Sequence, residues 1–294
     1  MNHAVTQDVF FEELKSSQPA VALITQQVRA ALAEDLGDGD RTAALLPADR
    51  KSRGELITRR RMVVCGRAWF DEVFRQLDPG IRIEWRVADG ESVERGRTLC
   101  SLTGPTRALL SGERTAMNYL QTLSGTASRA RLYADAVAGL PVRLLDTRKT
   151  LPGLRVQQKY AVRCGGGHNH RMGLFDAMLI KENHILAAGS ITAALKAAFA
   201  VSDGLQVEIE VENLEELKEA LAAGATHLLL DNFELEQLRR AVTLVAGRAR
   251  LEASGGVTLD TVRDIADTGV DDISIGDLTK DIIAADLSMR FLDA

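Results

Sequence analysis

The stretch VEIEVENLEELKEALAAGATHLLLDN, residues 207–232, decides the fold. Its first residues, 207–209, and the apolar run at 227–230 have the length and composition of short strands. Between them, residues 213–223 place apolar side chains at helical spacing. A strand, a helix and a second strand in this order form a crossover unit of a parallel sheet.

The same alternation extends to both sides of this stretch. We predict strands at 142–145, 177–180, 207–209, 227–230, 249–252 and 272–274, with helices between them, such as 234–245. Polar groups follow the strands in turn: Asp146-Thr147-Arg148-Lys149, Lys181-Glu182, Glu210, Asp231-Asn232, Ser254-Gly255-Gly256 and Gly276-Asp277. Successive strands that all end in polar residues favour the mouth of a barrel, because an open sheet gathers its site near one switch point. Since only six strands are clear, we expect an incomplete barrel of six or seven strands.

The N-terminal part of the chain has a different pattern. We predict helices at 19–36 and 66–77, strands at 54–58 and 81–87, and short antiparallel strands within 89–105. Two helices, 107–123 and 126–138, then lead to the first barrel strand. We therefore divide the chain into an α+β domain at 1–115 and a barrel domain at 116–279, with residues 280–294 packing back on the first domain.

Composition narrows the class of protein. The chain has 294 residues, 46% of them hydrophobic and 26% charged, which is typical of a soluble globular protein. A net charge of -5 argues against general binding to nucleic acid or to a membrane surface. No apolar run approaches the roughly 18 residues of a membrane span, and the N-terminus has no signal-peptide pattern. Three widely spaced cysteines, Cys65, Cys100 and Cys164, fit reduced thiols, so we expect a cytoplasmic protein.

A local cationic segment stands out in this acidic chain. Residues 146–171, DTRKTLPGLRVQQKYAVRCGGGHNHR, contain six Arg or Lys residues, whereas Asp146 is their only acid. Cations beside a glycine run suit a small, multiply charged anion. The side chains expected to meet at the barrel mouth are Arg148, Lys149, Arg171 and Lys181. A solvated basic face, or ion pairs with nearby acids, is the alternative.

Acidic residues end two successive barrel strands. Glu210 and Asp231 offer hard oxygen ligands, which suit Mg²⁺ in a phosphate site. General acid–base chemistry and charge balance for the lysines are alternatives. Glu208 shares a strand face with Glu210.

Small residues follow the last two strands. Ser254-Gly255-Gly256 and Gly276-Asp277 let backbone N–H groups approach a phosphate, as barrel enzymes do at this position. His168 and His170 resemble a metal pair, but no third ligand lies at a suitable spacing. Orientation of an anionic substrate is the favoured role for this pair.

Longer motifs identify a family. They are EDLGDGDRT (34–42), SGERTAMNYLQTLSGTAS (111–128), LLDTRKTLPGLR (144–155), KYAVRCGGGHNHRMGLFDAMLIKENHI (159–185), VEIEVENLEEL (207–217), LLLDNF (228–233), EASGGV (252–257) and DDISIGDLT (271–279). Together they resemble the quinolinate phosphoribosyltransferase family over nearly the whole chain. The succession of DTRKT, GGGHNHR and IKENH at this spacing is highly specific.

This resemblance implies an α/β fold, in which an N-terminal α+β sandwich domain is joined to an incomplete parallel α/β barrel. It implies that quinolinate binds to Arg114, Thr147, Arg148, Lys149, His170, Arg171 and Lys181. Phosphoribosyl pyrophosphate is implied to bind to Lys181, Glu210, Asp231, Ser254, Gly255, Gly256 and Gly276, with Mg²⁺ on Glu210 and Asp231. Family members form dimers in which the arginine of the GERT motif, here Arg114, reaches the neighbour's site.

The implied reaction joins quinolinate to phosphoribosyl pyrophosphate and yields nicotinate mononucleotide, pyrophosphate and carbon dioxide, a step of de novo NAD biosynthesis. Positioning and metal-assisted departure of pyrophosphate supply most of the catalysis, so no protein nucleophile is needed. We expect catalytic roles for Lys149, Lys181, Glu210 and Asp231. The proton donor after decarboxylation stays open among Lys149, Lys181 and water.

Three other functions compete with this one. A phosphoribosyltransferase of the same fold could act on another acid, such as nicotinate, or belong to a molybdenum-transport-associated paralogue. A barrel aldolase could use Lys181 as a Schiff-base lysine, although its cationic surroundings do not form an apolar pocket. A binding module without catalysis is the third alternative, and retention of both carboxylates argues against it.

Overall fold

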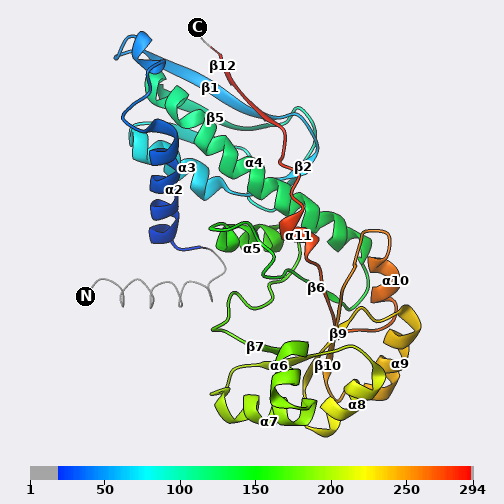
Figure 1. Ribbon diagram of the computed structural model, residues 1–294. Coiled ribbons are helices and arrows are strands. Elements are labelled where there is room, and N and C mark those ends of the chain that lie inside the picture. Colours follow the sequence, from blue (N-terminus) through cyan, green and yellow to red (C-terminus); the bar gives the residue numbers. More distant parts are fainter. Residues whose placement is uncertain (1–18, 293–294) are drawn as a thin grey trace. The chain divides into compact units, whose positions relative to one another are not determined.

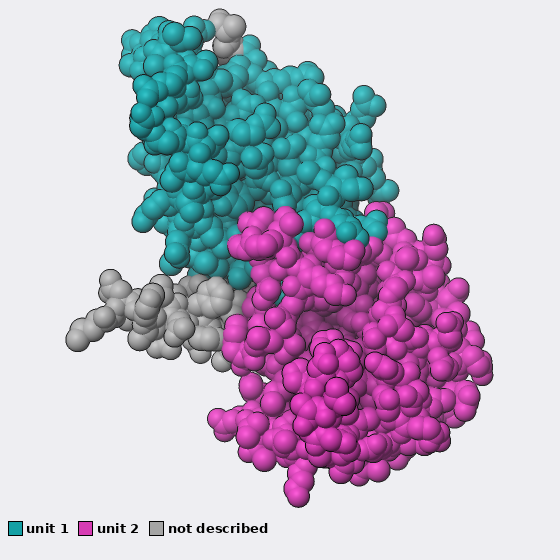
Figure 2. Space-filling view, viewed as in Figure 1, with its two compact units in different colours: residues 1–131, 156–166, 281–294 teal, residues 132–155, 167–280 magenta. Residues whose placement is uncertain are grey.

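The computed structural model describes residues 19–292 (Figure 1). Its internal contacts separate two compact units, which Figure 2 colours differently. Unit 1 comprises residues up to 131, 156–166 and those from 281 onward, whereas unit 2 comprises 132–155 and 167–280. This division differs from the boundary predicted after residue 115. Residues 1–18 of the predicted first domain and residues 293–294 lie outside the described residues.

An antiparallel sheet forms the framework of unit 1. Its strands are β1 (Lys51–Thr58), β3 (Arg82–Trp85), β5 (Thr98–Pro105) and β12 (Leu287–Phe291), in the order β12-β1-β5-β3. Two short strands, β2 (Met62–Val63) and β4 (Ser92–Val93), pair separately. The strands predicted at 54–58 and 81–87 are confirmed. The C-terminal strand β12 has no predicted counterpart, since its position is set by pairing with β1 and not by a distinctive local pattern.

The helices of unit 1 supply much of its apolar core. They include α2 (Val21–Leu36), which ends at Gly37 as predicted, and α3 (Arg67–Leu77), followed further along by α5 (Arg155–Cys164). Trp69, Phe70 and Phe74 of α3 are completely or almost completely buried. A short 3-10 helix covers Ala43–Leu45.

One helix replaces the two that we predicted before the barrel. Helix α4 runs without interruption over Thr106–Ala136, so the expected break near residues 124–125 is wrong. Both residues there serve packing: the Ser124 hydroxyl accepts the Cys65 N–H at 3.0 Å. A Cβ on Gly125 would lie 2.4 Å from the carbonyl oxygen of Ile283, so a close backbone approach accounts for the glycine.

Unit 2 contains the predicted parallel sheet. Its strands are β6 (Arg143–Leu145), β7 (Met178–Ile180), β8 (Val207–Val211), β9 (His227–Asp231), β10 (Arg250–Ser254) and β11 (Asp272–Ser274). The strands pair in the order β6-β11-β10-β9-β8-β7, so β7 to β11 are neighbours in chain order and β6 lies beside β11. Within residues 19–292, no strand pairing joins β6 to β7, so the barrel stays open there. His168 adds a parallel bridge to Leu145 at the β6 edge. The prediction of an incomplete parallel barrel is therefore confirmed.

Helices return the chain between these strands (Figure 1). They are α6 (Glu182–Ala188), α7 (Ile191–Val201), α8 (Leu214–Ala222), α9 (Leu235–Val245) and α10 (Val262–Ala266), and the short α11 (Asp277–Lys280) follows the last strand. Because every strand of the sheet is parallel to its neighbours, the carboxyl ends of all six point the same way. In the described part of the chain, no single helix is long and apolar enough to cross a membrane, and α6 with α7 meets that test only as a pair bent by 95°.

Candidate active site

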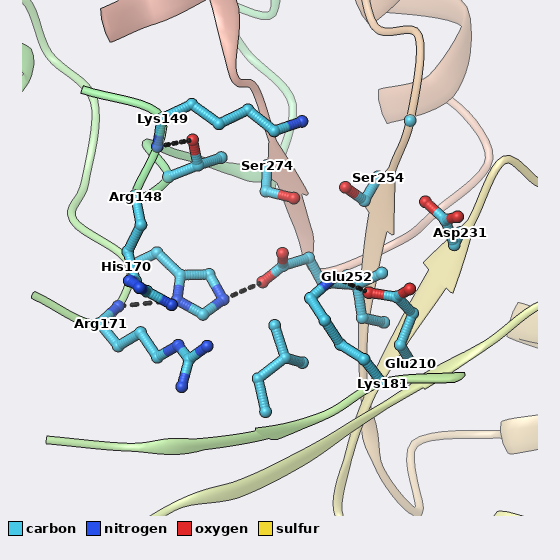
Figure 3. A pocket seen from close by; sticks show the side chains of 14 residues that line it. Arg148, Lys149, His170, Arg171, Lys181, Glu210, Asp231, Glu252, Ser254 and Ser274 are labelled. Atoms are coloured by element: carbon cyan, nitrogen blue, oxygen red, sulfur yellow. Dashed lines mark hydrogen bonds and ion pairs between the residues drawn. The ribbon is translucent and has the colours of Figure 1, made fainter. Parts of the chain in front are cut away.

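A cavity of about 210 Å³ lies in unit 2 at the carboxyl ends of the strands. Its wall combines residues from all six strands or from the turns next to them: Thr147, Arg148, Lys149, His170, Arg171, Leu179, Lys181, Glu210, Leu229, Asp231, Glu252, Ser254, Gly255 and Ser274. Figure 3 shows Arg148, Lys149 and Arg171 on one side of this cavity, opposite Asp231 and Ser254. The structure thus brings together side chains that are up to 127 positions apart, from Thr147 to Ser274.

Three of the predicted site residues lie outside this wall. Gly256 follows Gly255 but does not line the cavity. Gly276 lies beneath Lys149, since a Cβ there would approach the Cδ atom of that lysine to 2.9 Å. Arg114 is exposed on α4 and belongs to unit 1.

The cationic side of the cavity is held by backbone contacts. The Thr147 hydroxyl accepts the Lys149 N–H at 3.1 Å, and the Thr279 hydroxyl donates to the Lys149 carbonyl at 2.8 Å. The Arg171 guanidinium donates to the carbonyl of Ala177 at 3.1 Å. Burial, followed by the charge of nearby Arg148, lowers the pKa of Arg171. Two guanidinium groups that disfavour each other's charge provide a strong site for an anion.

The acid of the cationic segment, Asp146, is bound by residues that follow the glycine run. Asp146 is completely buried, and its carboxylate accepts the Asn169 amide at 2.5 Å and the His170 N–H at 3.0 Å. Arg148 retains a buried Nε atom without a hydrogen-bond partner. One donor of the Arg148 guanidinium is therefore left without a partner.

A carboxylate pair occupies the strands opposite. Lys181 Nζ lies 2.5 Å from the Glu210 carboxylate. Burial raises the pKa of Glu210, although Lys181 opposes this effect, and the charge of Asp231 raises it further. The Asn232 side-chain amide donates to Asp231 at 2.8 Å.

The turn after β10 requires its first glycine. Gly255 has φ +96°, a conformation that L side chains rarely adopt, and a Cβ there would come within 2.1 Å of the Asn232 amide oxygen. The glycine therefore allows the turns after β9 and β10 to meet closely beside Asp231. Phosphate approach, the role predicted for this glycine, is thus joined by close packing as a second reason for it.

A buried group of three side chains was largely missed. His170 Nε2 lies 3.1 Å from Glu208 and 3.4 Å from Glu252, and both carboxylates are buried. Burial, followed by the charge of Glu208, raises the pKa of Glu252 to about 8. Sequence analysis placed Glu208 on the face of Glu210 but gave Glu252 no role. The available signal was an acid inside an apolar strand, two residues before Ser254.

Family models match almost all of the described chain. The model described as "Quinolinate phosphoribosyl transferase, N-terminal domain" matches residues 40–124, and the C-terminal domain of the same family matches residues 126–290. The chain is 40% identical to the "Probable nicotinate-nucleotide pyrophosphorylase [carboxylating]" of Bacillus subtilis, over 87% of this chain and 89% of that protein. The chloroplastic Arabidopsis thaliana protein named nicotinate-nucleotide pyrophosphorylase [carboxylating] is also 40% identical, over 90% of this chain and 81% of that protein.

Solved structures share this fold. The nicotinate-nucleotide pyrophosphorylase from Francisella tularensis is 45% identical, with a TM-score of 0.91 over 94% of this chain and 98% of that chain. Human nicotinic acid phosphoribosyltransferase, covering 92% of this chain and 74% of its own, is only 14% identical at a TM-score of 0.62. That second likeness extends to the fold alone.

Proposed function

The chain belongs to the quinolinate phosphoribosyltransferase family, and we propose that it transfers the phosphoribosyl group of phosphoribosyl pyrophosphate to quinolinate with decarboxylation. The products are nicotinate mononucleotide, pyrophosphate and carbon dioxide, so the protein is a pentosyltransferase of NAD biosynthesis. The observation that carries this proposal is a single cavity with clustered cations facing a carboxylate pair. Such a cavity matches two polyanionic substrates, one of which brings a divalent cation.

Quinolinate binds to the cationic side in this proposal. Arg148 and Arg171 bind its two carboxylates, because a guanidinium fork matches a carboxylate in two hydrogen bonds. Lys149 adds a compact charge nearby, and Thr147 and His170 complete this part of the wall. A dicarboxylate uses both arginines, whereas a monocarboxylate leaves one of them unsatisfied.

The phosphoribosyl group extends toward Ser254 and Gly255 at the end of β10. Both residues line the cavity, and small side chains there leave backbone N–H groups accessible to a phosphate. Gly256 and Gly276 contribute through the shape of the turns in this proposal, and Lys181 faces both substrates.

Mg²⁺ fits the carboxylate side of the cavity. Glu210 and Asp231 present oxygen ligands from adjacent strands, and the charge of Asp231 already disfavours the ionised form of Glu210. We propose that these two carboxylates hold the ion together with oxygens of the substrate. When bound, Mg²⁺ supplies stabilisation for the negative charge of departing pyrophosphate.

The residues of the cavity act by positioning and by charge. Arg148 and Arg171 orient the pyridine nitrogen toward C1 of the ribose, and alignment of this kind supplies up to about 7–11 kcal/mol of a barrier. The nitrogen–carbon bond forms as the bond to pyrophosphate breaks. The alkylated ring nitrogen is then cationic and stabilises the electron pair left at C2 when carbon dioxide departs. A proton finally bonds to C2, for which Lys149, Lys181 and water remain the candidate donors.

We further propose a dimer in which Arg114 of one subunit completes the quinolinate site of the other. This proposal is supported by the exposure of Arg114 and by its place in the GERT motif of α4. A cytoplasmic location remains our proposal as well, and it rests on the three unpaired cysteines. Some plant relatives are named as chloroplastic or mitochondrial.

A paired assay tests the reaction. Purified protein receives Mg²⁺ and phosphoribosyl pyrophosphate with either quinolinate or nicotinate, and both nicotinate mononucleotide and carbon dioxide are measured. We expect equal amounts of nucleotide and carbon dioxide from quinolinate and no nucleotide from nicotinate. Nucleotide from nicotinate alone would overturn the assigned acid, and no product from either would favour the paralogue or a binding module.

A further inference from the structure

One carboxyl group of the cavity has no role in the reaction described above. Glu252 on β10 is only 5% exposed, yet it lines the cavity (Figure 3). One of its oxygens, Oε2, lies 3.4 Å from His170 Nε2, whereas Oε1 is buried without a hydrogen-bond partner. A buried oxygen without a partner costs stability, so a proton or a ligand is expected to satisfy it.

The hydrogen bonds of His170 fix the position of its proton. The backbone N–H of Arg171 donates to His170 Nδ1 at 2.7 Å, so Nδ1 acts as an acceptor and the ring proton that faces the carboxylates is the one on Nε2. This Nε2–H group donates to Glu208 at 3.1 Å. Glu208 and Glu252 are only 4% and 5% exposed, and both lie beside this one imidazole ring. Two buried carboxylates this close together cannot both ionise without a large cost in desolvation and mutual repulsion.

The other neighbours of Glu252 are Ser274 and Asp272 on β11, and Asp272 is already paired with Arg143 at 2.7 Å and with Arg250 at 2.9 Å. Burial, followed by the charge of Glu208, raises the pKa of Glu252 to about 8, although His170 and a hydrogen bond with Ser274 oppose this effect. Its carboxyl group therefore retains a proton near neutral pH. One imidazole and two carboxylates with ligand atoms within 4.8 Å also resemble a metal site. The proton on Nε2 argues against metal binding, because a metal needs the lone pair of that nitrogen.

We propose that Glu252 is a substrate-binding residue that donates a hydrogen bond from its protonated carboxyl group to a carboxylate of quinolinate. This inference rests on the proposed function. The donor is an O–H group on Oε1, the oxygen that has no partner in the protein. A neutral carboxyl group adds a donor without adding negative charge, whereas ionised Glu252 both loses the donor and repels the dianion.

The proposal predicts a pH dependence of defined sign. Glu252 is protonated below its pKa of about 8 and ionised above it. Affinity for quinolinate is therefore full below about pH 8 and falls by up to about tenfold per pH unit above it. Quinolinate itself stays a dianion throughout this range. Phosphoribosyl pyrophosphate binds on the other side of the cavity in this proposal. Its affinity should therefore fall much less when Glu252 loses its proton.

Glu252→Gln tests the proposal because it resembles the protonated acid. Its amide N–H replaces the O–H donor, and its carbonyl oxygen faces the Nε2–H of His170. Quinolinate affinity is measured by calorimetry, and KM and kcat by product assay, from about pH 7 to about pH 9.5. We expect the Gln variant to bind within about threefold of the wild type at pH 7 and to retain that affinity at pH 9.5. Glu212→Gln is the matched control, because it removes an exposed acid that directly follows β8 of the same sheet. Its affinity for quinolinate should depend on pH as that of the wild type does.

A second variant guards against a simple loss of folding. Glu208→Gln removes the neighbouring charge that raises the pKa of Glu252, so the loss of affinity should begin at lower pH than in the wild type. An unshifted profile in this variant overturns the proposal, as does a profile in Glu252→Gln that coincides with that of the wild type. A fall of kcat in Glu252→Gln with unchanged quinolinate affinity at every pH also overturns it and makes Glu252 the proton donor to C2. Failure of the wild type to form nicotinate mononucleotide would instead refute the proposed function.

Discussion

Lys181 Nζ lies 2.5 Å from the Glu210 carboxylate, so one cation of the cavity is paired with an acid of the neighbouring strand. The two residues belong to neighbouring strand ends, after β7 and on β8. The dicarboxylate is proposed to bind to the other three cations, Arg148, Lys149 and Arg171. Lys181 lies between the proposed quinolinate side and the proposed magnesium side of the cavity. This division leads to separate predictions for the two substrates.

Arg148→Ala should weaken quinolinate binding by about tenfold to 150-fold, because a charge-assisted hydrogen bond contributes roughly 1.5–3 kcal/mol. The loss for phosphoribosyl pyrophosphate should be much smaller. Titration calorimetry with each substrate measures both effects. Equal losses for the two substrates would contradict the assignment of Arg148 to a quinolinate carboxylate.

Asp231→Asn should raise the magnesium concentration for half-maximal activity by about tenfold or more, because an amide replaces one of two anionic ligands. The exposed Glu236→Gln on α9 serves as the control, since it removes an acid of the same unit away from the cavity. Activity is measured against magnesium concentration at saturating substrates. An unaltered activation curve in Asp231→Asn would exclude this residue as a ligand.

Gly255→Ala should raise KM for phosphoribosyl pyrophosphate several-fold. The new Cβ displaces the Asn232 amide, which otherwise donates to Asp231, and the positive φ costs about 1–2 kcal/mol of stability. Gly247 has a similar φ, +75°, but a Cβ there would meet no other atom within 4 Å. Gly247→Ala should therefore lower stability without changing the kinetics. Kinetics and urea unfolding of both variants separate the two effects, and equal kinetics would show that the contact with Asn232 is unimportant.

Arg75→Met should destabilise unit 1 near neutral pH, by an amount that solvent screening of the exposed Arg75 keeps modest. Arg75 donates twice to Glu72, at 2.5 and 2.6 Å, and lowers the pKa of Glu72 from 4.5 to about 2. Because this pKa is depressed, the stabilisation is present above pH 4.5 and is lost as pH falls toward 2. Urea unfolding at pH 7 and about pH 3 should show a smaller difference between the variant and the wild type at the lower pH.

Arg61→Met is the control for that measurement. Its ion pair with Glu94, at 3.3 Å, is exposed on both sides, so the change should stay within about 0.5 kcal/mol at either pH. A pH-independent cost of Arg75→Met would show that the side chain acts by packing and not by charge.

Arg114→Ala and Arg148→Ala should complement each other if Arg114 acts across a dimer. Each variant alone should be nearly inactive. Mixing them under exchange conditions places one intact site in each mixed dimer, and random pairing restores about a quarter of the wild-type sites. Recovery is measured by product formation, and no recovery despite verified subunit exchange would place Arg114 within its own subunit's site.

Local patterns predicted the repeating part of the molecule. The stretch 207–232 became β8, α8 and β9, because alternation and helical spacing each bury an apolar face whatever lies elsewhere in the chain. Polar residues at strand ends then indicated the mouth, since parallel strands carry their carboxyl ends to one side. Ten of the residues that line the cavity follow from this reasoning and the family motifs, including Arg148 and Glu210.

Long-range packing decided the rest. Ser124-Gly125 has the composition of a helix break, yet α4 continues through it because both residues contact distant backbone. Strand β12 exists through its ladder with β1. The position of Glu252 within a strand places it on the face of Ser254, but its burial beside Glu208 and His170 comes from contacts with distant parts of the chain. The sequence by itself therefore determined the strands, the mouth and the reactive residue types, whereas the tertiary structure decided which carboxyl group keeps its proton, because desolvation and neighbouring charge depend on contacts between residues far apart in the chain.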